Sequence, residues 1–123
     1  MTTLTLTIDT WLDAYGEPDE NRRAELIERV WAPTGRLVDP PFEGTGHEQI
    51  HALAAAAQQQ FPGHRFRRTS GIDAHHRYAR YTWELLDPRG SIAAAGLDVA
   101  QVDEDGKLLQ VAGFFGEVPA LTP

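Results

Sequence analysis

Residues 78–116, YARYTWELLDPRGSIAAAGLDVAQVDEDGKLLQVAGFFG, decide the fold class of this chain. Within residues 79–85, apolar and aromatic side chains alternate with polar ones, which is typical of a β-strand with one buried face. Segments rich in Asp, Pro and Gly at 87–90 and 103–106 are predicted turns between long strands, and residues 73–76 form a similar break. From His64 onward we therefore expect four antiparallel strands in a meander.

The last of these strands carries apolar residues on both faces. Val111, Gly113 and Phe115 alternate with Gln110, Ala112 and Phe114. One face is expected to cover the core, and the other needs a partner to cover its apolar side chains. This pattern predicts a homodimer through the outer face of the sheet.

The first half of the chain reads as three helices and one short strand. The first helix carries apolar residues at helical spacing over 8–15 and ends at Gly16, and the second is capped by Asp19, buries Trp31 and ends at 33–35. A strand over 36–39 precedes the third helix, which opens at 45–48 with a capping box that pairs Glu48 with the Thr45 amide. The order predicts a single α+β domain over residues 1–123, in which a cone-shaped, curved antiparallel sheet encloses a pocket with these helices.

Composition excludes several classes of protein. The 123 residues carry a formal net charge of −7 and no cysteine, which argues against nucleic-acid binding and removes disulfides, thiolate nucleophiles and sulfur-ligated metals. The longest apolar stretch, residues 52–57, is too short to span a bilayer, and the opening residues lack the basic start of a secretion signal. We expect a cytoplasmic protein that binds neither membranes nor nucleic acids.

Several short motifs resemble one known family. They are RLVDP at 36–40, FEG at 42–44, EQI at 48–50, DEDGKL at 103–108 and FFG at 114–116. Together they resemble the nuclear-transport-factor-2-like (NTF2-like) superfamily, in its SnoaL-like and ketosteroid-isomerase-like branch, over nearly the whole chain. The fold that this resemblance implies is the same α+β cone.

The resemblance also implies a site and a reaction. Asp39 matches the general base of the ketosteroid isomerases, Tyr15 matches their tyrosine hydrogen-bond donor, and Asp98 matches a second donor, a carboxylic acid that stays protonated. The implied reaction is a proton transfer next to a carbonyl group, as in isomerases and polyketide cyclases, without a cofactor or metal. The expected ligand is an apolar, carbonyl-containing small molecule.

The residues themselves support a pocket of this kind. Apolar walls from Trp11, Trp83 and Phe115 would disfavour an ionised Asp39 and raise its pKa, which makes it a better proton acceptor. Tyr81 and His64 are further candidates for contact with a ligand. An alternative with the same pocket is a protein that binds an apolar small molecule without converting it.

A competing motif lies at residues 47–51. The sequence HEQIH fits the H-E-x-x-H pattern of zinc peptidases, in which two histidines one helical turn apart hold the metal. Three features oppose a zinc hydrolase: Glu48 has a predicted capping role, the motif lies in the first helical turn, and Ala54 stands where the longer motif needs glycine. We expect no metal here.

Overall fold

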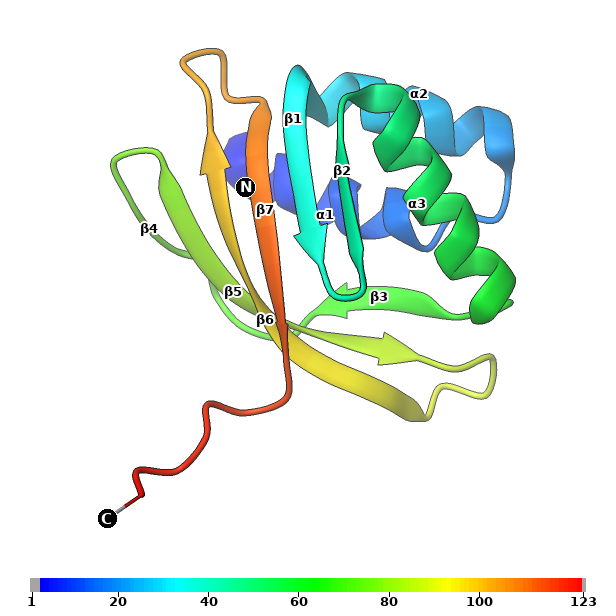
Figure 1. The fold of residues 1–123 in the computed structure, drawn as a ribbon, viewed down its shortest axis with the longest axis vertical. Helices are drawn as coiled ribbons and strands as arrows, with labels where there is room; N and C mark the ends of the chain where they lie inside the picture. The colour runs from blue at the N-terminus through cyan, green and yellow to red at the C-terminus, as the bar shows by residue number, and fades with distance from the viewer. Residues whose placement is uncertain (1–2, 123) are drawn as a thin grey trace.

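The computed structural model describes residues 3–122 as three helices and seven strands (Figure 1). The helices are α1 (Thr3–Tyr15), α2 (Glu20–Val30) and α3 (His47–Gln60). The strands are β1 (Trp31–Asp39), β2 (Phe42–Thr45), β3 (Arg65–Arg68), β4 (Asp73–His75), β5 (Tyr78–Leu86), β6 (Ile92–Val102) and β7 (Leu108–Phe115). They form one curved sheet in the order β2-β1-β7-β6-β5-β3, with β4 paired to β5, and the helices cover its concave side. The α+β cone with three helices in the first half of the chain is confirmed.

The sheet is mixed, whereas the sequence predicted antiparallel pairing throughout. β1 runs parallel to β7, with Leu37 opposite Val111, and every other pair of neighbouring strands is antiparallel. Parallel neighbours need a long connection. Here most of the chain separates β1 from β7, so local sequence patterns carry no signal of this pairing.

The first strand of the expected meander is broken into two short strands. β3 pairs with the second half of β5 and β4 with its first half. Residues 69–72 bulge out between them, and the Ser70 hydroxyl accepts a hydrogen bond from the Thr82 amide in place of a strand partner. Bulges increase the bending of a sheet. Figure 1 shows β5 and β6 curving at this level, so that their lower halves pass beneath the helices together with β3.

The second helix ends earlier than expected. Asp19 caps its start, as predicted, by accepting a hydrogen bond from the Asn21 amide. Its last residue is Val30, and Trp31 already has the extended backbone of β1. Pro33 lacks the amide hydrogen that a continued helix needs, and Trp31 is instead fully buried against Trp11 at the helix–sheet junction.

The capping of α3 also differs from the expected box. Gln49, not Glu48, reaches back to the Thr45 amide, which donates to Gln49 Oε1 at 2.8 Å. Gly46 occupies the cap position and provides no side chain. Glu48 was therefore the wrong residue of a correctly located helix start.

The core lies between the helices and the concave face of the sheet. Its largest fully buried side chains are Trp11, Trp31, Tyr81, Ile8, Ile27, Leu37, Ile50, Leu86, Leu108 and Val111. Within residues 3–122, no helix is long and apolar enough to cross a membrane.

Candidate active site

Asp39 ends β1 with its carboxyl group turned into the cone. The Tyr15 hydroxyl donates a hydrogen bond of 2.6 Å to Asp39 Oδ2, and only 8% of Asp39 is exposed. Tyr15 is the last residue of α1, and its ring is stacked on Trp11 and on Phe66, both at 4.8 Å between ring centroids. The stacking fixes the phenol, so the donor cannot swing away from the carboxylate without breaking the core.

Asp98 lies on β6 and is held by two donors from β5. The Tyr81 hydroxyl donates to Oδ2 and the Trp83 indole Nε1 donates to Oδ1, each at 2.9 Å. Tyr81 stands directly opposite Asp98 in the strand register, and Trp83 follows two residues later on the same inward face. Asp98 is 6% exposed, and both of its oxygens are already occupied.

The two carboxyl groups meet over Gly113 of β7. A Cβ atom built on Gly113 would lie 2.5 Å from Asp39 Oδ1 and 3.2 Å from Asp98 Oδ1. The absence of a side chain at this position is what lets both groups approach the same point of the sheet. Asp39 Oδ1 is buried there and has no hydrogen-bond partner among residues 3–122.

Burial dominates the electrostatics of the pair. It raises the pKa of Asp39, while the bond from Tyr15 lowers it. Burial, with the added effect of the Asp39 charge, raises the pKa of Asp98 to about 7, against the opposing bonds from Tyr81 and Trp83. Burial and the neighbouring carboxylates also raise the pKa values of Tyr15 and Tyr81, so both phenols stay protonated and act as donors.

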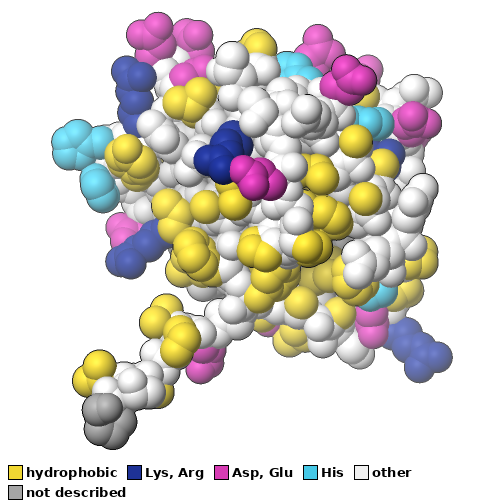
Figure 2. All heavy atoms as spheres, in the orientation of Figure 1, with side chains coloured by type: hydrophobic (Ala, Val, Ile, Leu, Met, Phe, Trp, Pro, Cys, Tyr) yellow, Lys and Arg dark blue, Asp and Glu magenta, His cyan; other side chains and the backbone are white. Residues whose placement is uncertain are grey.

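A cavity of about 200 Å³ lies against Asp39. Most of its lining is apolar or aromatic: Tyr15, Asp39, Pro40, Pro41, Phe42, Ala57, Gln60, Phe61, Phe66, Leu85, Ala93, Ala94 and Phe115. None of these residues is basic, so Asp39 provides the charge of the cavity. Figure 2 shows hydrophobic side chains gathered on the visible face around the β1–β2 turn, which contributes Pro40 and Pro41 to this lining.

The residues named from the sequence divide into three groups. Tyr15, Asp39 and Phe115 line the cavity. The other candidates from the core, Asp98, Trp11, Tyr81 and Trp83, are buried behind the lining. His64 lies outside it, with its Nδ1 3.1 Å from the Pro62 carbonyl oxygen.

Sequence reasoning missed part of the lining and the partners of Asp98. Phe66 sits between Arg65 and Arg67 in β3, an alternation that signals an inward-facing ring. Gln60 is the last residue of α3 and Phe61 is its C-cap, and neither was named as a candidate from the sequence. Tyr81 and Trp83 were named as candidates for contact with a ligand, and the structure shows that both donate to Asp98, a role that the sequence did not indicate.

The HEQIH segment has a structural explanation. His47 Nε2 donates to the Trp31 carbonyl at 2.7 Å, and His51 Nε2 donates to the Glu20 carbonyl at 3.2 Å, so the two rings tie α3 to the start of β1 and to the start of α2. Among the residues that the structure describes, no group of three or more histidine, aspartate or glutamate side chains is placed to hold a metal ion. The geometry therefore does not favour the zinc hydrolase.

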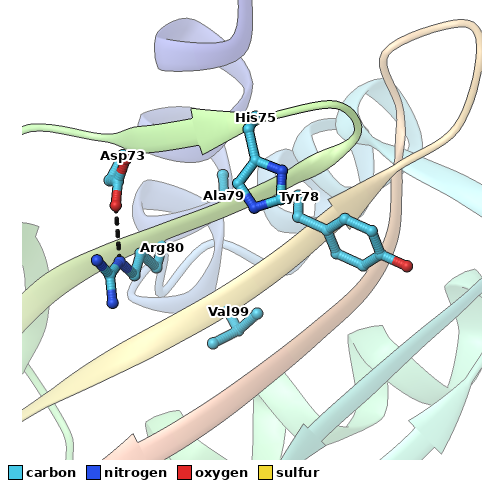
Figure 3. Close-up of a pocket in the computed structure, with 6 residues that line it drawn as sticks. All are labelled: Asp73, His75, Tyr78, Ala79, Arg80 and Val99. Atoms are coloured by element: carbon cyan, nitrogen blue, oxygen red, sulfur yellow. Dashed lines mark hydrogen bonds and ion pairs between the residues drawn. The ribbon is translucent and has the colours of Figure 1, made fainter.

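A second hollow, of about 250 Å³, lies on the outer face of the sheet. Figure 3 shows its lining, in which Arg80 donates to Asp73 while His75 and Tyr78 project beside Val99. Both partners of this ion pair are about two-thirds exposed. The charged groups of this hollow are paired with each other and exposed to solvent. It therefore lacks what distinguishes the cavity at Asp39, a buried carboxyl group with one oxygen unpaired.

The architecture and the inward carboxyl groups define an NTF2-like α+β cone. A solved structure from Agrobacterium tumefaciens, of a SnoaL-like protein to which isomerase activity is attributed, matches with a TM-score of 0.88 and 37% sequence identity, covering 95% of this chain and 100% of that one. The chain belongs to the SnoaL-like family.

More distant structures share the fold. An NTF2-like protein of unknown function from Exiguobacterium matches with a TM-score of 0.72 at 18% identity, over 91% of this chain and 99% of that one. A SnoaL-like protein from Jannaschia to which polyketide cyclase activity is attributed matches at 0.67 and 14%, over 94% and 89%. No protein-family model and no curated protein matches the chain.

Proposed function

We propose that this protein is a cofactor-independent enzyme that moves a proton at the carbon next to a carbonyl group, with Asp39 as the general base. The observation that carries the proposal is the position of Asp39, a buried carboxyl group at an apolar cavity that contains no basic residue. Burial raises the pKa of Asp39, and a base works best when its pKa lies near the operating pH. The attributed isomerase and cyclase activities of two relatives support a reaction of this class.

The reaction begins when Asp39 removes a proton from the carbon next to the carbonyl. The electrons of that C–H bond form the double bond of an enolate, and negative charge moves to the carbonyl oxygen. Tyr15 lines the cavity beside Asp39 and is a protonated donor, and its O–H bond can rotate while the ring stays in place, so the same hydroxyl can donate to an enolate oxygen that lies beside Asp39. The base and the donor lie next to each other in the site. The acidic carbon and the carbonyl oxygen are also close together in the substrate, so one bound ketone can contact both residues.

The sequence had assigned Asp98 as a second donor to that oxygen. Asp98 does not line the cavity and is bonded to Tyr81 and Trp83. The proposal therefore keeps Tyr15 as the donor that reaches the substrate and gives Asp98 no contact with it. From the enolate, return of the proton to another carbon gives an isomerase, and attack on a second carbonyl gives a cyclase.

The cavity favours a small, neutral substrate. An engineered apolar cavity of about 150 Å³ binds benzene. The cavity here, about 200 Å³, has room for one or two rings, and its single charged group repels anions. We propose an apolar ketone of that size as the substrate class.

Hydrogen–deuterium exchange separates the enzyme from a protein that only binds. The bicyclic ketone 2-tetralone is incubated in D₂O with and without the protein, and NMR follows both its binding and the loss of its α-hydrogen signals. The proposal predicts binding together with exchange faster than in buffer. Binding without faster exchange would favour the alternative, a non-catalytic binder, for which the largely apolar lining is the supporting observation.

We also propose that a second copy of the chain covers the outer face of the sheet. Five apolar side chains adjoin one another on this face: Val38, Leu97, Val99, Ala112 and Phe114. Ion pairs surround them, Arg80 with Asp73, Arg67 with Glu84 and Arg36 with Glu43, so the face is close to neutral although the chain carries −7. Two copies can therefore meet here without bringing their excess negative charge together.

A further inference from the structure

Asp98 is a buried carboxyl group to which the proposed reaction gives no part. The residue is 6% exposed, and it is not part of the lining of the cavity that Asp39 lines. A buried carboxyl group is unfavourable unless it is paired or hydrogen-bonded. Tyr81 and Trp83 satisfy two of its acceptor positions, yet neither explains why Asp98 Oδ1 also approaches a second carboxyl group.

Two carboxyl groups lie beside Gly113, around the space that a side chain at this position would occupy. This space is called the gap. Asp39 Oδ1 and Asp98 Oδ1 both approach the point where a side chain of Gly113 would begin. Asp39 Oδ1 is buried and finds no donor among the described residues. A proton on Asp98 Oδ1 would supply the donor that Asp39 Oδ1 lacks.

The other charged groups around the pair leave this arrangement undisturbed. Tyr15 from α1 faces Asp39, and Tyr81 from β5 faces Asp98, both as neutral donors. Beyond Tyr81, Arg68 of β3 forms an ion pair with Asp9 of α1 at 2.8 Å, so the charge of this guanidinium is already paired with a carboxylate. Among residues 3–122, no basic side chain is bonded to either carboxyl group of the pair, and like charges this close favour one shared proton.

We propose that Asp98 keeps the single proton of this pair and donates it to Asp39 Oδ1 across the gap beside Gly113, which holds Asp39 as an ionised, oriented base. This inference rests on the proposed role of Asp39. Asp98 is then a positioning residue, because it acts through Asp39 and does not touch the substrate. Tyr81 and Trp83 orient Asp98 so that its proton faces the gap.

The Asp98→Asn substitution tests this arrangement. The Trp83 indole is a donor only, so it must face the amide oxygen, which places the amide nitrogen toward the Tyr81 hydroxyl, a group that can also accept. The amide oxygen then occupies the position next to the gap. The Asp98→Asn side chain therefore cannot donate to Asp39.

The test is an NMR titration of the aspartate side-chain carboxyl carbons, which needs no substrate. Without its donor, Asp39 in Asp98→Asn should hold its own proton more tightly, and its titration midpoint should move to higher pH than in the wild type. If Asp98 were instead an ionised neighbour, removing its charge would move the Asp39 midpoint to lower pH. A lower or unchanged midpoint overturns the proposal.

Substitution at the gap gives a second, independent measurement. The methyl group of Gly113→Ala would lie 2.5 Å from Asp39 Oδ1 and 3.2 Å from Asp98 Oδ1 in their present positions, so it should displace the two carboxyl groups and make their titrations independent of each other. Gly71→Ala is the matched control, because a Cβ there would meet no described atom within 4 Å, and it should leave both titrations unchanged. Titrations that remain coupled in folded Gly113→Ala would contradict the inference.

Exchange kinetics connect the pair to the reaction. With 2-tetralone at neutral pH, Asp98→Asn should exchange α-hydrogens at least tenfold more slowly, with partial recovery at higher pH, where Asp39 ionises again. If the wild type exchanges the ketone and Asp98→Asn does so at the same rate, Asp98 has no positioning role. If the wild type itself does not exchange the ketone, the proposed function fails while the titration still decides whether the two groups share a proton.

Discussion

At the scale of single residues, the Tyr15–Asp39 contact has two opposing effects on the base. Burial raises the pKa of Asp39, and the phenol hydrogen bond lowers it. The same bond satisfies Oδ2 while Oδ1 remains without a donor among residues 3–122. Tyr15 therefore determines both the basicity of Asp39 and which of its oxygens is occupied.

The Tyr15→Phe substitution should separate the effects of the Tyr15–Asp39 hydrogen bond from those of ring packing. The phenylalanine ring keeps the stacking on Trp11 and Phe66, but Asp39 Oδ2 loses its donor. The pKa of Asp39 should rise further, and the free energy of unfolding at neutral pH should fall by about 1–3 kcal/mol, the usual effect of leaving a buried acceptor unpaired. Urea denaturation and NMR titration measure the two quantities. Tyr78→Phe, at a half-exposed ring, is the control, and equal losses in both variants would argue against the contact.

The raised pKa of Asp98 predicts how stability depends on pH. The unfolded carboxyl group releases its proton near the ordinary value of 3.8, whereas the folded one keeps it to about 7. Between these limits the folded state binds more protons, so raising the pH should lower the free energy of unfolding. In Asp98→Asn this contribution is absent, and denaturation series across this range should show a smaller decrease. Equal pH dependence in both proteins would contradict the assignment.

The sequence indicated which side chains of the candidate site are buried better than it indicated their contacts. Asp39 and Asp98 were recognised through a family resemblance, and the alternation in β5 placed Tyr81 and Trp83 on the inward face. Which of them meets Asp98 depends on the β5–β6 register, which shifts between Leu85 and Leu86. A register irregularity of this kind leaves no pattern in the sequence, so the donors to Asp98 could not be assigned from it.

At the scale of secondary-structure elements, α3 connects the cavity to the rest of the fold. Its N-terminal half is tied to α2 and β1 by His47 and His51, and its last turn supplies Gln60 to the cavity lining. Local signals mark both ends of this helix, because Thr45 and Gly46 stand before its start and Phe-Pro-Gly at 61–63 follows its last residue. They did not identify the residue that caps it, because adjacent Glu48 and Gln49 have similar reach.

Substitution at these two positions should show which side chain caps α3. Gln49→Ala removes the acceptor for the Thr45 amide and should lower the free energy of unfolding by about 1 kcal/mol. Glu48→Ala removes no contact to that amide and should have a smaller effect. Parallel urea denaturation of the two variants makes the comparison, and a larger loss for Glu48→Ala would restore the original capping box.

The boundary between α2 and β1 could not be predicted from local sequence patterns. Helical spacing placed Trp31 on the second helix, yet the residue begins a strand that pairs in parallel with β7, far along the chain. Burial of Trp31 against Trp11 and the strand partner outweigh its local helical pattern. Antiparallel β5, β6 and β7 were predictable because short turns join them.

At the scale of the whole molecule, the curved sheet has two different surfaces. The concave surface holds the core, the carboxyl pair and the cavity, and the outer surface presents apolar side chains between paired charges. Residues 116–122, which follow β7, extend away from the body in Figure 1. Alternation in the last strand predicted the two-sided character of the sheet, but nothing local indicates how strongly two copies would associate.

Light scattering coupled to size exclusion should test the proposed dimer. The wild type should give twice the chain mass of 13.6 kDa, and Phe114→Glu, which places a charge in the middle of the outer face, should give a single chain. Val118→Glu in the exposed tail is the matched control and should leave the dimer intact. A wild type that runs as a single chain at micromolar concentration would contradict the dimer.

The central claim is that Asp39 acts as a base inside an apolar cavity, and one comparison tests it most directly. The rate of α-hydrogen exchange of 2-tetralone in D₂O is measured for the wild type, for Asp39→Asn and for Asp73→Asn, an exposed carboxylate on the outer face. The account predicts that Asp39→Asn is slower by about 10²- to 10⁴-fold while Asp73→Asn matches the wild type. Equal rates for folded Asp39→Asn and the wild type would show that the base lies elsewhere.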